Sequence, residues 1–339
     1  HGGSAADVGD AGAGTSLGTN YLEGGHYAEA VVSTGAEAEL VDRRAPDVTF
    51  NDATAQTLPG SASAEIPGAR PSANSILEVL GRSEYNEAAR SNLAAEFSGG
   101  VTLFDYDNDG DLDLFEVRRT EQRLYRNDDG RFTDVTAQSG LTGSKVGVGI
   151  TAIAGDFDND GKQDLFVLGY GALTLLRNQG GGHFADVTAA AKIPGYPYLS
   201  VSAAFFDFDH DGDLDIFCAG FADLNKPLNQ GAQGIGSPLR APQMFALAPN
   251  LLLRNNGDGT FTDVTASAKV AGMQGHAVAV VPTDFDNRRD VDLLVVNRGA
   301  RPVLYRNLRD GTFGDVAEEA GLSFTGDFTS AAVGDLNKD

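Results

Sequence analysis

The sequence predicts an all-β fold, a β-propeller of four-stranded blades, and three observations support this prediction. Similar acidic segments recur at spacings of 51, 51, 77 and 51 residues, and they begin at Asp105, Asp156, Asp207, Asp284 and Asp335. Each repeat contains short apolar segments rich in β-branched residues, which is typical of strands. Glycine provides 43 of the 339 residues, about twice its usual share of ~7%, which indicates many tight turns. Four-stranded units of about 50 residues are typical of propeller blades.

The second repeat shows how the strands of one blade are expected to follow each other. Segments 146–154, 164–168, 173–177 and 184–188 are the expected strands, and an acidic loop separates the first two. A parallel β-helix would need shorter rungs, and no repeat has room for a crossover helix. The spacing of 77 residues indicates a 26-residue insertion between the second and third strands of the third repeat, near 222–250.

The first 98 residues contain no copy of the repeat. We expect residues 1–45 to form a flexible Gly/Ala/Asp-rich segment, residues 46–98 an irregular and short-helical segment that packs on the propeller, and residues 99–339 the repeats. Within 72–97, Ser75 and Glu78 have the spacing of a helix capping box, and Gly81 is expected to divide the helical stretch.

The fifth repeat stops inside its acidic loop, at residue 339. Propellers close into rings that protect their edge strands, and four to eight blades are usual. We therefore expect this sequence to be a fragment of a longer chain with seven blades, of which four are complete here and a fifth is begun. The alternative is that residues 21–60, including 48–50, or a neighbouring subunit complete the ring.

The charge balance excludes several classes of partner. The chain has 48 acidic and 25 basic residues and a formal net charge of −23, so it would repel the phosphate backbone of nucleic acids. No run of 18 apolar residues occurs, which argues against a transmembrane helix. The single cysteine, Cys218, allows no internal disulfide and no metal site built on several cysteines.

The acidic loops have the composition of a metal site. The first is Asp-Tyr-Asp-Asn-Asp-Gly-Asp-Leu-Asp at 105–113, with carboxylates at positions 1, 3, 5 and 9, glycine at position 6 and a backbone carbonyl available at position 7. Such a cluster repels itself unless a cation lies within it, and flexible all-oxygen ligation favours Ca²⁺. Three Ca²⁺ sites are therefore predicted. Their residues are Asp105, Asp107, Asp109, Asp111, Asp113, Asp156, Asp158, Asp160, Lys162, Asp164, Asp207, Asp209, Asp211, Asp213 and Asp215.

The fourth loop, 284–292, departs from this pattern. Arg288 replaces the carboxylate at position 5 and Arg289 replaces the glycine. We expect no Ca²⁺ in this loop, because the Arg288 guanidinium can lie among Asp284, Asp286 and Asp292 in its place.

An EF-hand is the alternative interpretation of the first loop, because Glu116 stands at position 12. The equivalent residues of the next two loops are Val167 and Cys218, which cannot be bidentate ligands. The flanking segments also indicate strands rather than helices, so the EF-hand is rejected.

The segments FDYDNDGDLDLF and GDFDNDGKQDLF, followed by LYRN-type and FTDVT-type strands, resemble FG-GAP/VCBS repeats. These repeats are the Ca²⁺-binding blades of integrin-α-like propellers, and the likeness is greatest to the cartilage acidic protein (ASPIC/UnbV) branch, although that branch's C-terminal segment is absent here. The resemblance covers residues 99–339. It implies the fold, the metal and an extracellular location, secreted or at the cell surface. It does not specify one function, since such repeats occur in adhesins, lyases, dehydratases and surface proteins.

The resemblance also implies that ligands bind on the face opposite the metal loops. The insertion and the connectors between blades are expected there. The candidate residues of this ligand face are Tyr196, Tyr198, Arg240, Met244, Phe245 and His276.

The leading hypothesis is a secreted or cell-surface Ca²⁺-binding propeller that acts as a binding, adhesion or self-assembling module. Its expected partners are a protein or glycan ligand, or further copies of the chain. The alternative is a propeller-fold carbohydrate-active enzyme, a polysaccharide lyase or a sugar dehydratase. Catalysis has little support in the sequence, which contains no nucleophile elbow, phosphate-binding loop or dinucleotide fingerprint.

Overall fold

The computed structural model describes residues 21–22, 26–27, 85–141, 147–226 and 244–334. The chain divides into two units, residues 1–53 and 54–339, and each is described by itself. In the first unit, strand β1 (Tyr21–Leu22) pairs antiparallel with β2 (His26–Tyr27). The expected helical stretch at 72–84 and the residues 335–339 lie outside the described parts.

Within its described residues, the second unit contains four antiparallel sheets, each built from four consecutive strands, and the fourth sheet also includes a short fifth strand. The first sheet has β3 (Val101–Phe104), β4 (Asp113–Val117), β5 (Gln122–Asp128) and β6 (Arg131–Asp134). The second has β7 (Val148–Gly155), β8 (Asp164–Tyr170), β9 (Ala172–Asn178) and β10 (Phe184–Asp186). The third has β11 (Leu199–Phe206), β12 (Asp215–Ala222), β13 (Leu251–Asn255) and β14 (Phe261–Asp263). The fourth has β15 (His276–Thr283), β16 (Asp292–Ala300), β17 (Val303–Asn307) and β18 (Phe313–Asp315), and β19 (Gly326–Asp327) pairs with β16.

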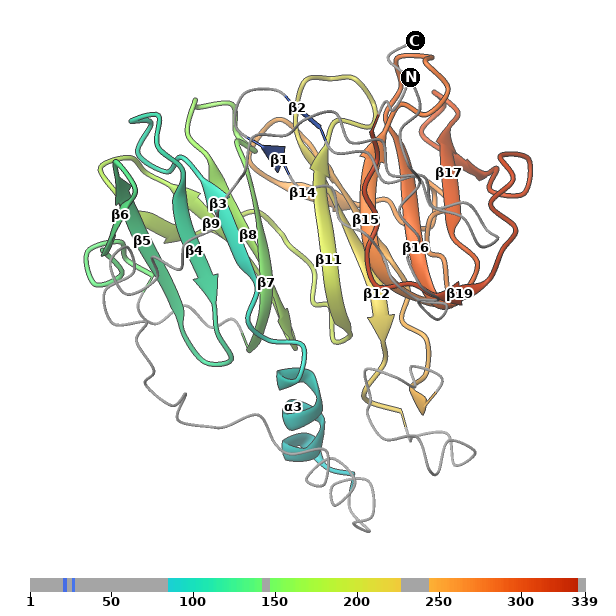
Figure 1. Cartoon of the computed structure of the whole chain (residues 1–339), viewed down its shortest axis with the longest axis horizontal. Coiled ribbons are helices and arrows are strands. Elements are labelled where there is room, and N and C mark those ends of the chain that lie inside the picture. The colour runs from blue at the N-terminus through green and yellow to red at the C-terminus, as the bar shows by residue number, and fades with distance from the viewer. Residues whose placement is uncertain (1–20, 23–25, 28–84, 142–146, 227–243, 335–339) are drawn as a thin grey trace, which may run out of the picture. The chain divides into compact units, whose positions relative to one another are not determined.

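These sheets confirm the predicted all-β, blade-like fold. The first strands of successive sheets contact each other, β3 with β7, β7 with β11 and β11 with β15. Figure 1 shows the four sheets following one another in chain order, from teal to red. The strands of the second repeat begin and end within a few residues of the expected positions.

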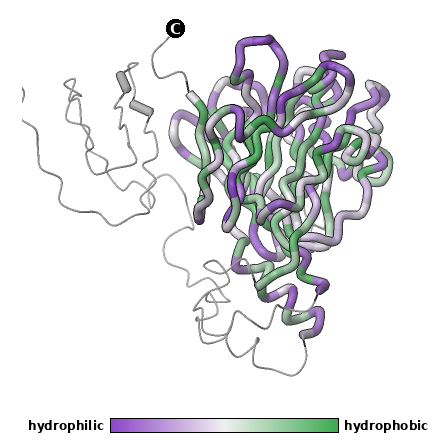
Figure 2. The backbone as a smooth tube through the Cα atoms, turned by 90° about the vertical axis from the view of Figure 1, so that its right-hand side faces the viewer, coloured by the Kyte–Doolittle hydropathy of each residue, from purple (hydrophilic) through white to green (hydrophobic). Residues whose placement is uncertain are grey.

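The hydrophobic cores lie between neighbouring sheets. Phe115 and Leu165 belong to the core between the first and second sheets, Phe166 and Ile216 to the next, and Phe217 and Leu293 to the third. Strand β8 is buried along its whole length, because its two faces pack on different neighbours. Figure 2 shows mostly apolar strands and more hydrophilic connecting loops.

The helix α3 (Glu87–Ala95) begins at Asn86, whose side chain accepts a hydrogen bond from the Ala89 N–H at 3.0 Å. It lies inside the stretch that the sequence predicts to be helical. Leu93 and Ala94 are buried against a cluster that includes Ile150 and Leu199 of the first strands of two sheets. Among the described residues, no helix is long and apolar enough to cross a membrane.

Candidate metal centres

Each acidic loop connects the first and second strands of a sheet, and its last aspartate is the first residue of the second strand. These position-9 residues are Asp113, Asp164, Asp215 and Asp292. They are fully or almost fully buried, with exposed fractions of 0 to 1%. A buried carboxylate needs hydrogen-bond partners or a counter-ion, so these four positions determine the chemistry of the loops.

Three aspartates converge in every loop. The aspartates at positions 1, 3 and 9 place carboxylate oxygens within 4.8 Å of one another, and this holds in all four loops. The triads are Asp105, Asp107 and Asp113; Asp156, Asp158 and Asp164; Asp207, Asp209 and Asp215; and Asp284, Asp286 and Asp292. The structure therefore brings together nine of the fifteen predicted metal residues, in groups of three.

The backbone holds the triad in place, as the second loop shows. Asp156 accepts hydrogen bonds from the N–H groups of Asp160 at 3.0 Å and Gly161 at 2.8 Å. Asp164 accepts from the N–H groups of Phe157 at 3.2 Å and Asn178 at 2.7 Å. The loop thus wraps around its own first carboxylate. The positive φ of Gly161, +84°, allows this turn without strain.

The carboxylates at position 5 do not join the triads. Asp109, Asp160 and Asp211 each accept a hydrogen bond from the backbone N–H two residues later, at 2.9 to 3.0 Å. The Lys162 ammonium group lies 2.8 Å from the Asp160 carboxylate and holds the pKa of that carboxyl below its usual value.

Lys162 stands at position 7 of its loop, and the position-7 side chains of the other two loops have partners outside their own loop. Asp111 accepts a hydrogen bond from the Asp129 N–H at 3.0 Å, and Asp213 accepts one from the Asn159 amide at 2.7 Å. At position 7, the group that we expect to bind a metal is therefore the backbone carbonyl and not the side chain.

The buried carboxylates resist ionisation when no cation is bound. Desolvation by burial raises the pKa of Asp113 to about 6, and of Asp164 and Asp215 to about 7. In addition, one buried carboxylate oxygen of Asp158 and one of Asp207 have no hydrogen-bond partner within the described residues. A cation at the triads would satisfy these oxygens and favour the ionised carboxylates, so the residues present fit a hard metal ion.

In the fourth loop, arginines contact the triad. Arg288 Nε lies 3.2 Å and Arg306 Nε 3.0 Å from the same oxygen of Asp286. Arg288 therefore reaches one of the three carboxylates rather than all three. Arg289 takes the place of glycine and adopts a φ of +66°.

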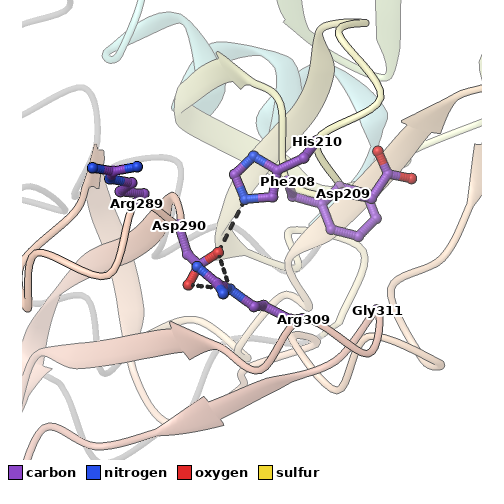
Figure 3. A pocket seen from close by; sticks show the side chains of 7 residues that line it. All are labelled: Phe208, Asp209, His210, Arg289, Asp290, Arg309 and Gly311. Carbon is purple, nitrogen blue, oxygen red and sulfur yellow. Dashed lines mark hydrogen bonds and ion pairs between the residues drawn. The ribbon is translucent and has the colours of Figure 1, made fainter.

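A cavity of about 370 Å³ lies where the third and fourth loops meet, lined by Asp209, His210, Arg289 and Arg309 among others. Figure 3 shows His210 and Arg309 both pointing toward Asp290. His210 Nε2 is 3.0 Å from Asp290, and Arg309 Nε is 2.6 and 2.7 Å from its two oxygens. Arg309 holds the pKa of Asp290 below its usual value.

The expected ligand face is corrected by burial. The side chains of Tyr196, Met244, Phe245 and His276 are only 3 to 6% exposed, so they belong to the interior and present no docking surface. The Tyr196 hydroxyl donates to the Pro249 carbonyl at 2.6 Å. The physical reason is that these side chains are more stable when packed against apolar neighbours, as Phe245 is against Leu199 and Phe221, than when facing water.

The other candidate residues of the ligand face differ in their surroundings. His276 Nδ1 lies 2.7 Å from the Phe221 carbonyl oxygen, and burial lowers its pKa. Tyr198 is half-buried and packs edge-on against Tyr196. Arg240 lies outside the described residues.

An Arg-Asn pair recurs near the end of each third strand, and the sequence alone indicated no role for it in the site. The structure gives the asparagine one: the backbone N–H groups of Asn127, Asn178, Asn255 and Asn307 donate to the position-9 aspartates at 2.7 to 2.8 Å. The signal that could have found them is their fixed distance of 14 or 15 residues from the position-9 aspartate in three of the four repeats.

Comparisons with solved structures give weak likenesses. An Agrocybe aegerita lectin that recognises non-reducing terminal N-acetylglucosamine is 18% identical, with a TM-score of 0.35, over 62% of this chain and 49% of the lectin chain. A Photorhabdus luminescens Tc holotoxin pore is 18% identical, with a TM-score of 0.30, over 64% of this chain and 9% of that chain. This chain thus spans about half the length of the lectin and a small part of the toxin. No curated protein matches the sequence.

The family comparison is more informative. The model of the FG-GAP-like repeat matches residues 105–167, 156–218 and 284–339. The matched segments start at position 1 of the first, second and fourth acidic loops and together span half of the chain. The chain therefore belongs to the FG-GAP-like repeat family.

Proposed function

We propose that loops 105–113, 156–164 and 207–215 each bind one Ca²⁺, and that the ions stabilise an extracellular binding module. The observation that supports this most directly is the convergence of three carboxylates in every loop of an FG-GAP-like repeat. Three carboxylates within 4.8 Å repel one another strongly, and bound Ca²⁺ supplies the compensating positive charge.

Calcium fits these loops better than other common cations. The donors are carboxylate and carbonyl oxygens, which favour hard cations over zinc or copper. Ca²⁺ accepts six to eight oxygens in flexible geometry, whereas Mg²⁺ demands a near-ideal octahedron. In the second loop, Asp156, Asp158 and Asp164 would hold the ion, and Asp160 and the Lys162 carbonyl are the further ligands that the sequence proposes.

The fourth loop is proposed to remain free of Ca²⁺. Its triad has the same geometry as the others, but it lacks a carboxylate at position 5. Two guanidinium groups already lie beside Asp286. Their positive charge reduces the electrostatic gain from a cation at this triad.

At the level of the whole protein, we propose a secreted or cell-surface module for binding, adhesion or self-assembly, related to the cartilage acidic protein branch. Calcium modules of the extracellular space typically bind at about 10⁻⁴ to 10⁻³ M. The proposed partner is a protein or glycan, or another copy of the chain. Because four of the six candidate ligand-face side chains are buried, the proposed binding surface would use Tyr198, Arg240 or residues outside that set.

The enzymatic alternative would need an ionisable side chain beside a cation in a cleft. His210 is next to Asp209 and lines a cavity, but its Nε2 is held by Asp290, which Arg309 also binds. This arrangement supports a structural role for His210, so binding is preferred to catalysis.

Two measurements test the proposal. Native mass spectrometry should find three Ca²⁺ ions per chain, and Asp158→Asn should reduce this to two, whereas Asp286→Asn in the fourth loop should leave three. Light scattering of the chain with and without Ca²⁺, and binding of the Ca²⁺-loaded chain to a glycan panel, then test the partner. A chain that binds no Ca²⁺ at millimolar concentration contradicts the proposal.

A further inference from the structure

In the first three loops, the position-9 aspartates use both carboxylate oxygens in hydrogen bonds. One oxygen accepts from the N–H group at position 2 of the same loop: Tyr106 to Asp113 at 3.0 Å, Phe157 to Asp164 at 3.2 Å and Phe208 to Asp215 at 2.9 Å. The other accepts from the backbone of the asparagine that ends the third strand, as described above. Each buried triad member is therefore fixed from two directions.

The same asparagines reach across to the preceding sheet. Asn178 Nδ2 donates to the Tyr106 carbonyl at 2.8 Å, across 72 residues of sequence. Asn255 Nδ2 donates to the Phe157 carbonyl at 2.7 Å, and Asn307 Nδ2 to the Phe208 carbonyl at 2.7 Å. Each acceptor is the position-2 residue whose N–H binds the aspartate of its own loop.

These contacts form one continuous buried path. It links the four position-9 aspartates through nine hydrogen bonds of 2.7 to 3.2 Å. The order is Asp113, Tyr106, Asn178, Asp164, Phe157, Asn255, Asp215, Phe208, Asn307, Asp292. Buried hydrogen bonds act in a low dielectric and are costly to break, so a shift at one aspartate affects the next.

A second, more exposed set of contacts joins the same loops. The position-4 side chain of each loop reaches position 6 or 7 of the next: Asn108 donates to the Gly161 carbonyl at 2.9 Å, and Asn159 to Asp213 at 2.7 Å. At the third junction, His210 contacts Asp290 at 3.0 Å. Positions 6 and 7 adjoin the proposed carbonyl ligand, so these contacts also connect one metal loop to the next.

We propose that the metal sites of neighbouring blades are energetically coupled, so that filling one raises the affinity of the next. This inference rests on the proposed Ca²⁺ binding. A bound ion fixes its position-9 aspartate, which fixes the asparagine backbone and, through the amide, position 2 of the preceding loop. A neighbouring loop that is already ordered loses less conformational entropy when it binds its own ion. Direct repulsion between two Ca²⁺ ions has the opposite sign, so positive coupling indicates that the protein contacts transmit the effect.

Asn127 provides a matched control. It has the same place in the first sheet, and its backbone donates to Asp113 at 2.8 Å. Its amide, however, donates to the Leu112 carbonyl of its own loop at 3.0 Å, and within the described residues it reaches no preceding sheet. Asn127→Ala and Asn178→Ala thus lose equivalent contacts inside the sheet, and only the second loses the bond to a neighbouring sheet.

The test is a Ca²⁺ titration of the whole chain, followed by NMR at the amides of Gly110, Gly161 and Gly212. Each of these N–H groups binds the position-1 aspartate of its own loop, at 2.9, 2.8 and 3.1 Å, so each reports one site. Disabling the first site with Asp107→Asn should weaken binding at Gly161 by about fivefold or more, the low end of usual coupling strengths. In the Asn178→Ala background the loss should be smaller, because only the Asn108 contact then joins the two loops, while in the Asn127→Ala background the full fivefold loss should persist.

The outcomes separate the two proposals. If none of the three amides responds to Ca²⁺ in the unaltered chain, the proposed metal binding fails. If all three respond but Asp107→Asn leaves the affinity at Gly161 unchanged, the metal binding stands and the coupling is wrong. This second comparison needs no asparagine variant, so it decides the question even if Asn178→Ala does not fold.

Discussion

The second and fourth acidic loops hold the same aspartate triad but differ in the side chains at positions 5 and 6. In both, the aspartates at positions 1, 3 and 9 converge within 4.8 Å. In both, an asparagine N–H holds the position-9 aspartate at 2.7 Å. The fourth loop has Arg288 and Arg289 where the second has Asp160 and Gly161. The blade therefore brings the three aspartates together in both loops, and we expect positions 5 and 6 to determine whether the triad binds a cation.

An arginine at the triad is not by itself the difference. Arg177 Nε lies 2.6 Å from Asp158 in the second loop, as Arg306 Nε lies 3.0 Å from Asp286 in the fourth. The fourth loop adds a second guanidinium, from Arg288, and removes one carboxylate. This shift of two charges at position 5 is what we expect to exclude Ca²⁺.

The largest expected effect is that of removing the metal from the first three loops. Each site adds about 2.7 kcal/mol to the free energy of unfolding at a hundredfold excess of Ca²⁺ over its Kd. Chelation should therefore lower Tm by more than about 10 °C, given a few degrees per kcal/mol for a protein of this size. Scanning calorimetry with and without EDTA measures this, with Mg²⁺ re-addition as the control. Identical melts would contradict the calcium assignment.

The sequence was sufficient to predict the aspartate triads because their spacing is local. Positions 1, 3 and 9 lie on a single loop between two strands. It was not sufficient for the links between loops. Asn178 and Asn255 bind carbonyls 72 and 98 residues away, and only the packing of one sheet on another places them there. It also misplaced Tyr196 and Phe245, since an aromatic residue in a connector has the same composition whether it is exposed or packed.

The second prediction concerns the fourth loop when its residues at positions 5 and 6 are replaced by those of the first three loops. Arg288→Asp combined with Arg289→Gly restores the carboxylate and the glycine of the first three loops, while the triad is already in place. The double variant should bind a fourth Ca²⁺ and gain about 2.7 kcal/mol at a hundredfold excess over the Kd of the new site. Native mass spectrometry counts the ions.

The matched control for this transfer is Arg288→Ala with Arg289→Ala, which removes both arginines without adding a ligand or a glycine. It should still bind three ions. A fourth ion in the control would mean that the arginines alone exclude the metal, and a double variant with three ions would mean that the loop is closed to Ca²⁺ for another reason.

The third prediction concerns pH. Burial raises the pKa of Asp113 to about 6 and of Asp164 and Asp215 to about 7. For a carboxyl group whose folded-state pKa is raised, the stabilising contribution is complete below its unfolded pKa near 4 and is lost as pH rises through 6 to 7. The metal-free chain should therefore melt at a lower temperature at pH 8 than at pH 5.

Bound calcium should counteract this loss of stability at high pH, because it binds the ionised form of the carboxylates. The difference in Tm between the Ca²⁺-loaded and the fully decalcified chain should widen from pH 5 to pH 8. Calorimetry at several pH values provides the measurement. A difference that stays constant across this range would show that the three buried aspartates do not take part in metal binding.

The smallest expected effect isolates the backbone of the fourth loop. Arg289 has a φ of +66°, whereas Gly161, at the same position of the second loop, has +84°. A side chain in this left-handed region costs about 1 to 2 kcal/mol, and the greater freedom of glycine in the unfolded chain offsets part of that, by about 0.4 to 1 kcal/mol. Arg289→Gly should therefore stabilise the metal-free chain by about 1 kcal/mol or less, measured by urea unfolding. Arg288→Gly is the control: Arg288 is not among the residues with positive φ, so glycine there should destabilise the chain. If both variants change stability in the same direction, the strain at Arg289 is not what distinguishes the two loops.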